Sequence, residues 1–228
     1  MKTIELHNLL YMLIPILITW YYYRNWLGNS IEIIKATLRM TIQLLLIGYV
    51  LIYIFENDNS LIGLTILLFM VCISSYISLR NLSNKTFHEY RLIFLSILLS
   101  GAFNLILVFI FVLQLEKLYI PQYVIPIAGM VFATSMNSVS LVAERFEKEM
   151  KSNTYFEARN RAFKAALIPQ INSFLAVGLV SLPGMMTGQI LSGVDPLIAV
   201  RYQIMVMAMI LGAASLSNII YLNMKRTK

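Results

Sequence analysis

The sequence is poor in the residues that catalytic and metal-binding sites usually need. Charged residues make up 13% of the 228 residues, and there are only two histidines and one cysteine. Cys72 has no second cysteine to pair with, which excludes a disulfide or a thiolate zinc cluster within the chain. The phosphate-binding loop Gly-x-x-x-x-Gly-Lys-Ser/Thr, the Gly-x-Ser-x-Gly elbow and the His-Glu-x-x-His zinc motif are all missing. We therefore expect a non-catalytic chain without a cofactor.

Apolar residues are in large excess. They account for 59% of the chain, and the mean hydropathy is +0.74. Soluble domains contain about 45–50% apolar and about 25% charged residues, and a chain this short cannot bury such an excess in one globular core. The composition predicts an all-α, polytopic membrane helix bundle that forms a single transmembrane domain over residues 1–228.

Seven apolar runs are long enough to cross a bilayer, which takes about 20 residues. The expected spans are 7–24, 37–55, 61–79, 92–115, 122–142, 166–182 and 197–221. The sixth run is the shortest and ends at Pro183-Gly184. Six spans plus a re-entrant segment are therefore the alternative.

The basic residues are unevenly distributed between the loops. Segments 24–39, 80–91 and 143–165 and the tail from 222 hold 15 of the 18 lysines and arginines, and Lys2, Lys117 and Arg201 are the other three. Because cytoplasmic loops are enriched in these residues, the pattern predicts an outer N-terminus and a cytoplasmic C-terminus in the cell membrane. The net charge of +7 lies in short clusters rather than one stripe, so we expect no nucleic-acid partner. In this topology His7 and His88 lie at opposite faces and cannot form one site.

The longest polar stretch, 144–165, is expected to form short cytoplasmic helices. Two pairs of opposite charge are spaced four residues apart, Glu144 with Lys148 and Glu147 with Lys151. This spacing places both members of a pair on one helix face.

Polar side chains inside apolar runs are candidates for a transport path, because they are costly in lipid. Arg39 and Gln43 are four residues apart on one helix face, and Arg201 and Gln203 lie near the start of the last span. The alternative is that the arginines extend to the lipid head groups and the amides bond neighbouring helices.

Residues 179–196, LVSLPGMMTGQILSGVDP, combine helix-breaking and polar residues between two apolar runs. Irregular backbone at membrane depth is tolerated only where protein or water covers it. The segment therefore predicts a kinked or re-entrant element lining a path. A tight hairpin, with Gly184 and Gly188 allowing close helix packing, is the alternative. The candidate path residues here are Pro183, Gly184, Met185, Met186, Thr187, Gly188 and Gln189.

Three stretches are more specific than their composition: ALIPQINSFLAVGLVSLPGMMTGQILSGVDPLIAVRYQIMV at 166–206, R-x-x-x-Q-L-x-x-x-G-Y-V-L at 39–51 and V-I-P-I-A-G-M at 124–130, which ends at Met130. They resemble the FetB-type permease family, which comprises bacterial iron-export ABC permeases and plant aluminium-tolerance half-transporters. The resemblance covers the chain from about residue 36 onwards. It implies a permease subunit that acts as a homodimer with a separately encoded ATPase. The implied cargo is a metal ion, usually iron. The sequence does not identify the side chains that would bind the metal.

The chain departs from the family pattern in two places. Ala133 and Thr134 stand where the family has Gly and Asn, and the cytoplasmic loop after Met150 is shorter than in relatives. The remaining coupling loop, about 143–165, holds the candidate ATPase-docking residues Glu149, Glu157, Arg159 and Arg161. A secondary transporter and a non-transporting membrane sensor or assembly protein are the alternative functions. A secondary transporter usually shows inverted repeats and an intramembrane carboxylate.

Overall fold

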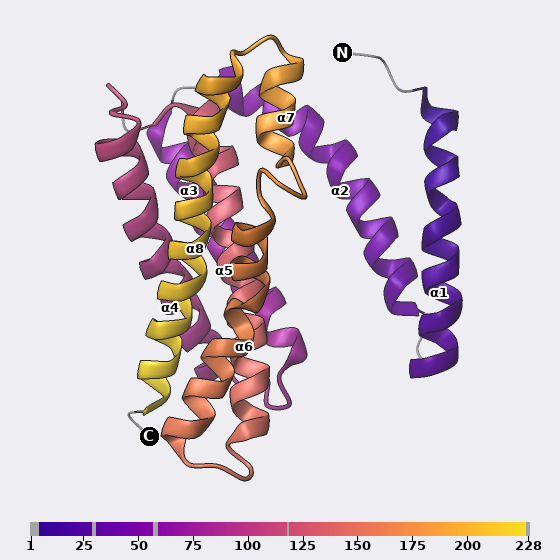
Figure 1. The fold of residues 1–228 in the computed structure, drawn as a ribbon, viewed down its shortest axis with the longest axis vertical. Helices are drawn as coiled ribbons and strands as arrows, with labels where there is room; N and C mark the ends of the chain where they lie inside the picture. Colours follow the sequence, from indigo (N-terminus) through magenta and orange to yellow (C-terminus); the bar gives the residue numbers. More distant parts are fainter. Residues whose placement is uncertain (1–4, 29–30, 57–58, 118, 227–228) are drawn as a thin grey trace. The chain divides into compact units, whose positions relative to one another are not determined.

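The computed structural model describes residues 5–28, 31–56, 59–117 and 119–226, and its described regular elements are helices (Figure 1). The chain divides into two compact units, Met1–Asn57 and Asp58–Lys228. Unit 1 contains the 3₁₀ helix η1 (Leu6–Met12) and the helices α1 (Leu13–Leu27) and α2 (Ile31–Glu56). Gly28 ends α1 with a φ of 73°, a left-handed conformation that glycine adopts without strain.

Unit 2 is a bundle of long helices that run up and down its length (Figure 1). Its elements are α3 (Ser60–Ser78), η2 (Leu79–Asn81), α4 (Phe87–Ile106), the π-helical turn η3 (Leu107–Val112), α5 (Pro121–Glu149), α6 (Tyr155–Ala176), α7 (Gly184–Leu191) and α8 (Pro196–Arg226). Helices α5 and α8 are the central pair, and α3, α4 and α6 pack around them. This arrangement places α7 beside the N-terminal half of α8.

Small hydroxyl side chains hold the central helices together. The backbone carbonyl of Ala213 on α8 accepts hydrogen bonds from Ser100 on α4 at 3.0 Å and Ser135 on α5 at 3.2 Å. Nearby, Asn218 donates to the Ser138 hydroxyl at 2.8 Å. All five residues are buried. Small residues let helices approach closely in lipid, and hydroxyl bonds then add specificity to the packing.

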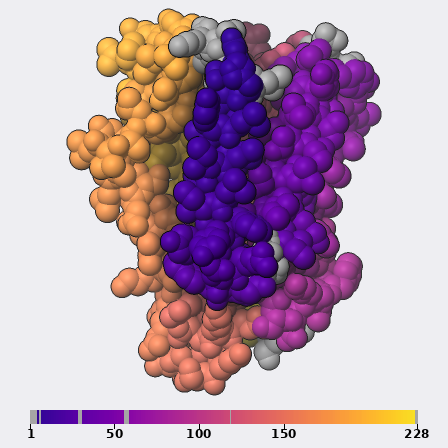
Figure 2. Space-filling view, turned by 90° about the vertical axis from the view of Figure 1, so that its right-hand side faces the viewer, coloured from indigo at the N-terminus to yellow at the C-terminus, as the bar shows by residue number. Residues whose placement is uncertain are grey.

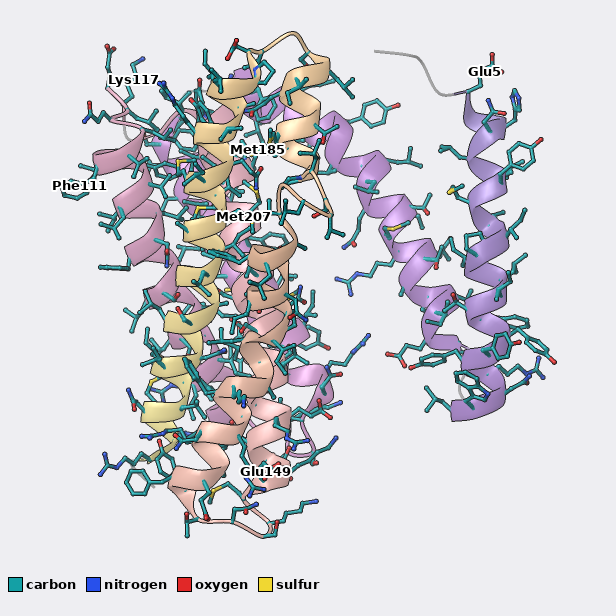
Figure 3. All side chains as sticks on the ribbon, in the orientation of Figure 1. Glu5, Phe111, Lys117, Glu149, Met185 and Met207 are labelled. Carbon is teal, nitrogen blue, oxygen red and sulfur yellow. The ribbon has the colours of Figure 1, made fainter. Side chains whose placement is uncertain are left out.

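The two ends of unit 2 differ in charge. The α3–α4 connection, the α5–α6 turn and the end of α8 lie together at one end, which we call the basic end (Figure 1). Glu89 at the start of α4 pairs with Lys225 at the end of α8. The turn holding Glu149 is at the basic end and Lys117 is at the opposite end (Figure 3). All described lysines and arginines of unit 2 except Lys117 and Arg201 belong to segments at the basic end.

The polytopic helical class is confirmed, and within the described part of the chain five helices are long and apolar enough to cross a membrane. They cover Ile31–Phe55, Ser60–Asn81, Phe87–Val112, Pro121–Glu149 and Pro196–Arg226. Each of the five overlaps a span expected from the sequence. The expected first span, 7–24, is a 3₁₀ segment followed by the 15-residue α1. Lys2 and Lys228, which were counted in predicting the membrane orientation, lie outside the described residues.

The expected sixth span is not one continuous helix. Helix α6 ends at Ala176, six residues before the predicted end, and α7 resumes at Gly184. Gly178 has a φ of 81°, and its N–H donates to the carbonyl of Ser181 at 3.0 Å, which turns the chain out of the helix. The irregular part is therefore 177–183, and Met185 to Gln189, expected in a kinked segment, lie in a regular helix. Together α6, the break and α7 run from one end of unit 2 to the other as a discontinuous helix (Figure 1).

Candidate functional site

Two cavities lie on either side of α7, and together they contain most of the path residues expected in this part of the chain. The first, the α5–α7 cavity, has a volume of about 540 Å³. The second, the break cavity, has a volume of about 390 Å³ and lies where α6 breaks. Both volumes fall within the range of about 300–1,000 Å³ that is typical of small-molecule sites.

The α5–α7 cavity is built from three helix faces, each with residues four positions apart. They are Gln122, Pro126 and Met130 on α5, Met185 and Gln189 on α7, and Ile198 and Tyr202 on α8; Tyr123, Ile127 and Val194 complete the wall. Side chains four residues apart lie one above the other on a helix. The structure thus brings Met130, Met185 and Gln189 to one cavity. Sequence reasoning missed Gln122 and Tyr202, although the spacing of four from Gln122 to Pro126 to Met130 was readable.

The break cavity is almost entirely apolar. Its wall consists of Phe174, Val177, Gly178, Leu182, Pro183, Met186, Val200, Gln203, Ile204, Met207 and Ala208. Pro183, Met186 and Gln203 were expected from the sequence, whereas Phe174 was not. Met185 and Met207, which line different cavities, are both labelled in Figure 3. No charged side chain lines either cavity.

The other expected path residues lie elsewhere. Arg201 is exposed and lines neither cavity. Arg39 and Gln43 belong to α2 in unit 1, whereas both cavities are built from unit 2. The Thr187 hydroxyl donates to the carbonyl of Pro183 at 3.1 Å, within its own helix.

Gly184 and Gly188 do not serve close packing within this chain. A methyl group added at either position would meet no heavy atom within 4 Å. The glycines at close approaches are others: the same addition would lie 2.6 Å from the Asn104 side-chain oxygen at Gly212, 2.5 Å from the Phe132 ring at Gly101 and 2.0 Å from the Tyr119 ring at Gly63. A hairpin held by Gly184 and Gly188 is therefore not what the chain forms here.

The α5–α6 turn at the basic end holds the expected docking residues, but they have different environments. Glu149 is 8% exposed; its carboxylate forms an ion pair with Arg145 at 2.6 Å and accepts hydrogen bonds from Arg161 at 3.2 Å and Asn153 at 2.9 Å. Its carboxylate therefore shapes the turn. The expected Glu144–Lys148 pair forms at 2.6 Å. In contrast, Glu147 accepts a hydrogen bond from the Ser83 N–H at 3.1 Å instead of pairing with Lys151.

Glu157 caps the first turn of α6. Its carboxylate accepts hydrogen bonds from the N–H of Thr154 at 3.1 Å and from the Thr154 hydroxyl at 2.9 Å. These bonds hold the pKa of Glu157 below its ordinary value because they favour the charged form, and the bond from the backbone N–H has the larger effect. Separate short helices were expected over 144–165, but the segment consists of the ends of two long helices joined by a tight turn.

The exposed part of this turn is aromatic and basic. Phe156 is 53% exposed, and the guanidinium groups of Arg159 and Arg226 lie 5.2 and 5.5 Å from its ring centre. Tyr155 donates to the carbonyl of Leu222 at 2.7 Å and thereby ties the start of α6 to the end of α8. The turn forms one extremity of unit 2 (Figure 2). A partner bound here would contact α6 and α8 together.

Metal-ligating groups do not cluster in this part of the fold. Among the described residues, no three His, Cys, Asp or Glu side chains come close enough to hold a metal ion. A methionine-lined cavity can offer soft sulfur ligands, but iron prefers oxygen and imidazole ligands.

Comparison with known proteins identifies the family. The model of the uncharacterised protein family UPF0014 matches residues 6–228. A UPF0014 membrane protein of Synechocystis is 34% identical over 86% of this chain and 82% of its own length. The protein named "Probable iron export permease protein FetB" of Escherichia coli is 33% identical over 93% of this chain and 85% of its own length.

A plant relative is also similar, whereas no solved structure matches. The "Protein ALUMINUM SENSITIVE 3" of Arabidopsis thaliana is 32% identical over 82% of this chain and 73% of its own length. The match to the family model spans both units and includes both cavities and the α5–α6 turn. The chain is a multi-pass membrane protein that belongs to the UPF0014 family.

Proposed function

We propose that this chain is the membrane-spanning permease subunit of an ATP-driven transporter that exports metal ions, with iron as the first candidate. The observation that carries the proposal is its 33% identity to the protein named "Probable iron export permease protein FetB", which extends over nearly the whole chain. A separately encoded ATPase would supply ATP hydrolysis, since the chain has no phosphate-binding loop. Two copies of the chain and two ATPases would form the working assembly.

The proposed path runs along the discontinuous helix. Transporters commonly place substrate sites where a membrane helix is interrupted, because such backbone must line a cavity or be covered by protein. The two cavities beside α7 fit this role, with Met130, Met185 and Gln189 in one and Pro183, Met186 and Gln203 in the other. Arg39, Gln43 and Arg201 remain proposed path residues that neither cavity contains.

The proposed ATPase-docking surface is the α5–α6 turn. Exposed Phe156 and Arg226 and half-buried Arg159 form an aromatic and basic patch there. Buried Glu149 shapes the turn beneath the patch through its ion pairs, and exposed Glu157 and Arg161 beside it remain proposed docking residues. A push on this turn would reach α8 through the Tyr155–Leu222 hydrogen bond and so reach the cavities.

Co-purification with the ATPase tests the assembly. Wild-type chain co-expressed with a candidate ATPase in the cell membrane should retain it in stoichiometric amounts after detergent extraction. The double variant Phe156→Ala/Arg159→Glu should lose at least nine-tenths of it, whereas Glu116→Lys at the opposite end of unit 2 should not. Cells with the intact pair should also hold less iron than cells whose ATPase has lost its catalytic lysine.

Failure of the wild type to retain any ATPase, together with unchanged cellular iron, contradicts the proposal. Metal flux without an ATPase would then identify a secondary transporter. Absence of flux would identify a sensor or assembly protein.

A further inference from the structure

The chemistry of the break cavity is unusual for a path that carries a metal ion. Ten of its eleven wall residues are apolar, and the exception is Gln203. Gln203 is the eighth residue of α8, and with a rise of about 1.5 Å per residue it lies about 10 Å inside the helix from its start. The cavity therefore lies along the N-terminal half of α8, away from the basic end.

The side-chain oxygen of Gln203 is buried without a partner among the described residues. The residue is 6% exposed, and its side-chain oxygen has no hydrogen-bond partner within the described structure. Most buried polar groups in proteins are hydrogen-bonded, and a buried group left without a partner costs free energy. Because Gln203 also lines the cavity, its amide is the polar side chain available to a ligand there.

A second polar feature borders the same cavity. Pro183 and Met186 place the N-terminus of the eight-residue α7 at its wall. The first N–H groups of a helix have no acceptor within the helix, and they carry a partial positive charge. This feature favours an electronegative atom and disfavours a free cation.

A bare metal ion is poorly matched to these groups. No charged side chain lines the cavity, and iron is held best by carboxylate and imidazole ligands. An apolar wall with one amide and one helix N-terminus instead resembles the pockets that bind small organic molecules.

We propose that the break cavity binds an organic molecule with an apolar body and one hydrogen-bonding head group, held by Gln203 and the N-terminus of α7. This inference rests on the proposed transport function and narrows its substrate class. The metal crosses this part of the path as a complex with such a molecule and not as a bare ion.

Binding can be measured on the full chain, with or without an ATPase, in lipid nanodiscs. Phe174→Trp introduces an indole at the cavity wall, in a background where Trp20→Phe and Trp26→Phe remove the two native tryptophans. The probe is 8-hydroxyquinoline, an apolar chelator with one polar edge, used alone and as its iron(II) complex. Iron(II) alone is the comparison.

We expect saturable quenching by the probe and by its iron complex, and none by iron(II) alone. Gln203→Leu should weaken probe binding about tenfold, as the loss of one hydrogen bond would. It should also leave the chain at least as stable to heat, because it removes an unpartnered buried amide. Gln170→Leu is the matched control: Gln170 also has a side-chain oxygen without a described partner, but it lines neither cavity.

Ala208→Phe provides a second variant that fills the cavity from α8 and should abolish saturable quenching while Gln203 is intact. Three results would overturn the inference: quenching that rises linearly with probe, equal affinity in Gln203→Leu, or saturable quenching by iron(II) alone. Each is read from the permease itself. An absent ATPase partner would therefore refute the proposed function without deciding the ligand class.

Discussion

Single polar residues in this chain have roles that depend on whether their hydrogen-bonding groups have partners. Glu149 and Gln203 are both nearly buried, at 8% and 6% exposure. The Glu149 carboxylate accepts bonds from three neighbours, whereas the Gln203 oxygen has none in the described structure. Removal of these two groups should therefore shift stability in opposite directions. This contrast separates a residue that shapes the fold from one kept for a ligand.

Glu149→Ala is expected to destabilise the α5–α6 turn. The change removes three charge-assisted bonds and leaves Arg145, Arg161 and Asn153 to water. Because both arginines are about half exposed, the loss should be about 1–3 kcal/mol rather than that of a fully buried pair. Thermal unfolding in detergent measures it.

Glu144→Ala provides the control for this measurement. Glu144 makes one exposed pair with Lys148 within the same helix, which is worth a few tenths of a kcal/mol. Equal losses in the two variants would contradict the central role of Glu149.

At the scale of the helices, the start of α6 should carry a pH-dependent contribution to stability. The pKa of Glu157 is lowered in the folded chain, first by the Thr154 backbone N–H and then by the Thr154 hydroxyl. A depressed folded pKa means that the stabilisation is complete above the ordinary value of 4.5 and is lost as the pH falls through the lower folded value.

Wild type and Glu157→Gln should therefore differ in unfolding temperature at pH 7, and the difference should shrink below pH 4.5. A parallel series with Thr154→Ala should lose only the smaller part of the pH dependence, because the hydroxyl bond is gone but the backbone bond, the larger cause of the lowered pKa, remains. If the difference between wild type and Glu157→Gln stayed constant down to about pH 3, the cap would not be the cause.

The apolar runs predicted the long helices well, because lipid leaves few alternatives to a continuous helix. The prediction that the sixth span ends at Pro183-Gly184 is wrong, since α6 ends at Ala176. The signal for the true position was Gly178, since a helix commonly ends just before a glycine that can adopt a positive φ. Pro183, as the residue before α7, then marks where the next helix begins.

Other features could not be derived from local sequence. The partners of Glu149 include Arg161, twelve residues away across a turn, and the pairing depends on how α5 meets α6. The orphaned oxygen of Gln203 depends on the packing of α6, α7 and α8, which no local pattern encodes. By contrast, the four-residue spacing of the cavity residues on α5 and α7 can be read from the sequence. It predicts which helix faces line the α5–α7 cavity once the two helices are known to face each other.

At the scale of the whole molecule, the uneven charge of unit 2 predicts its orientation in the membrane. Basic residues are retained on the cytoplasmic side, so the basic end with the α5–α6 turn should face the cytoplasm. Cys72 is the only cysteine, and Cys72→Ala gives a background without thiols. Exposed Lys151 and Glu116, one near each end, then serve as positions for single cysteines.

In intact cells, a membrane-impermeant maleimide should label Glu116→Cys and leave Lys151→Cys unlabelled until the cells are opened. Both positions are exposed, so a difference between them reports the side of the membrane and not burial. The reverse pattern would place the α5–α6 turn outside the cell, where no ATP is available to a docked ATPase. That outcome would remove the proposed docking surface, while the ligand class of the break cavity would still rest on Gln203.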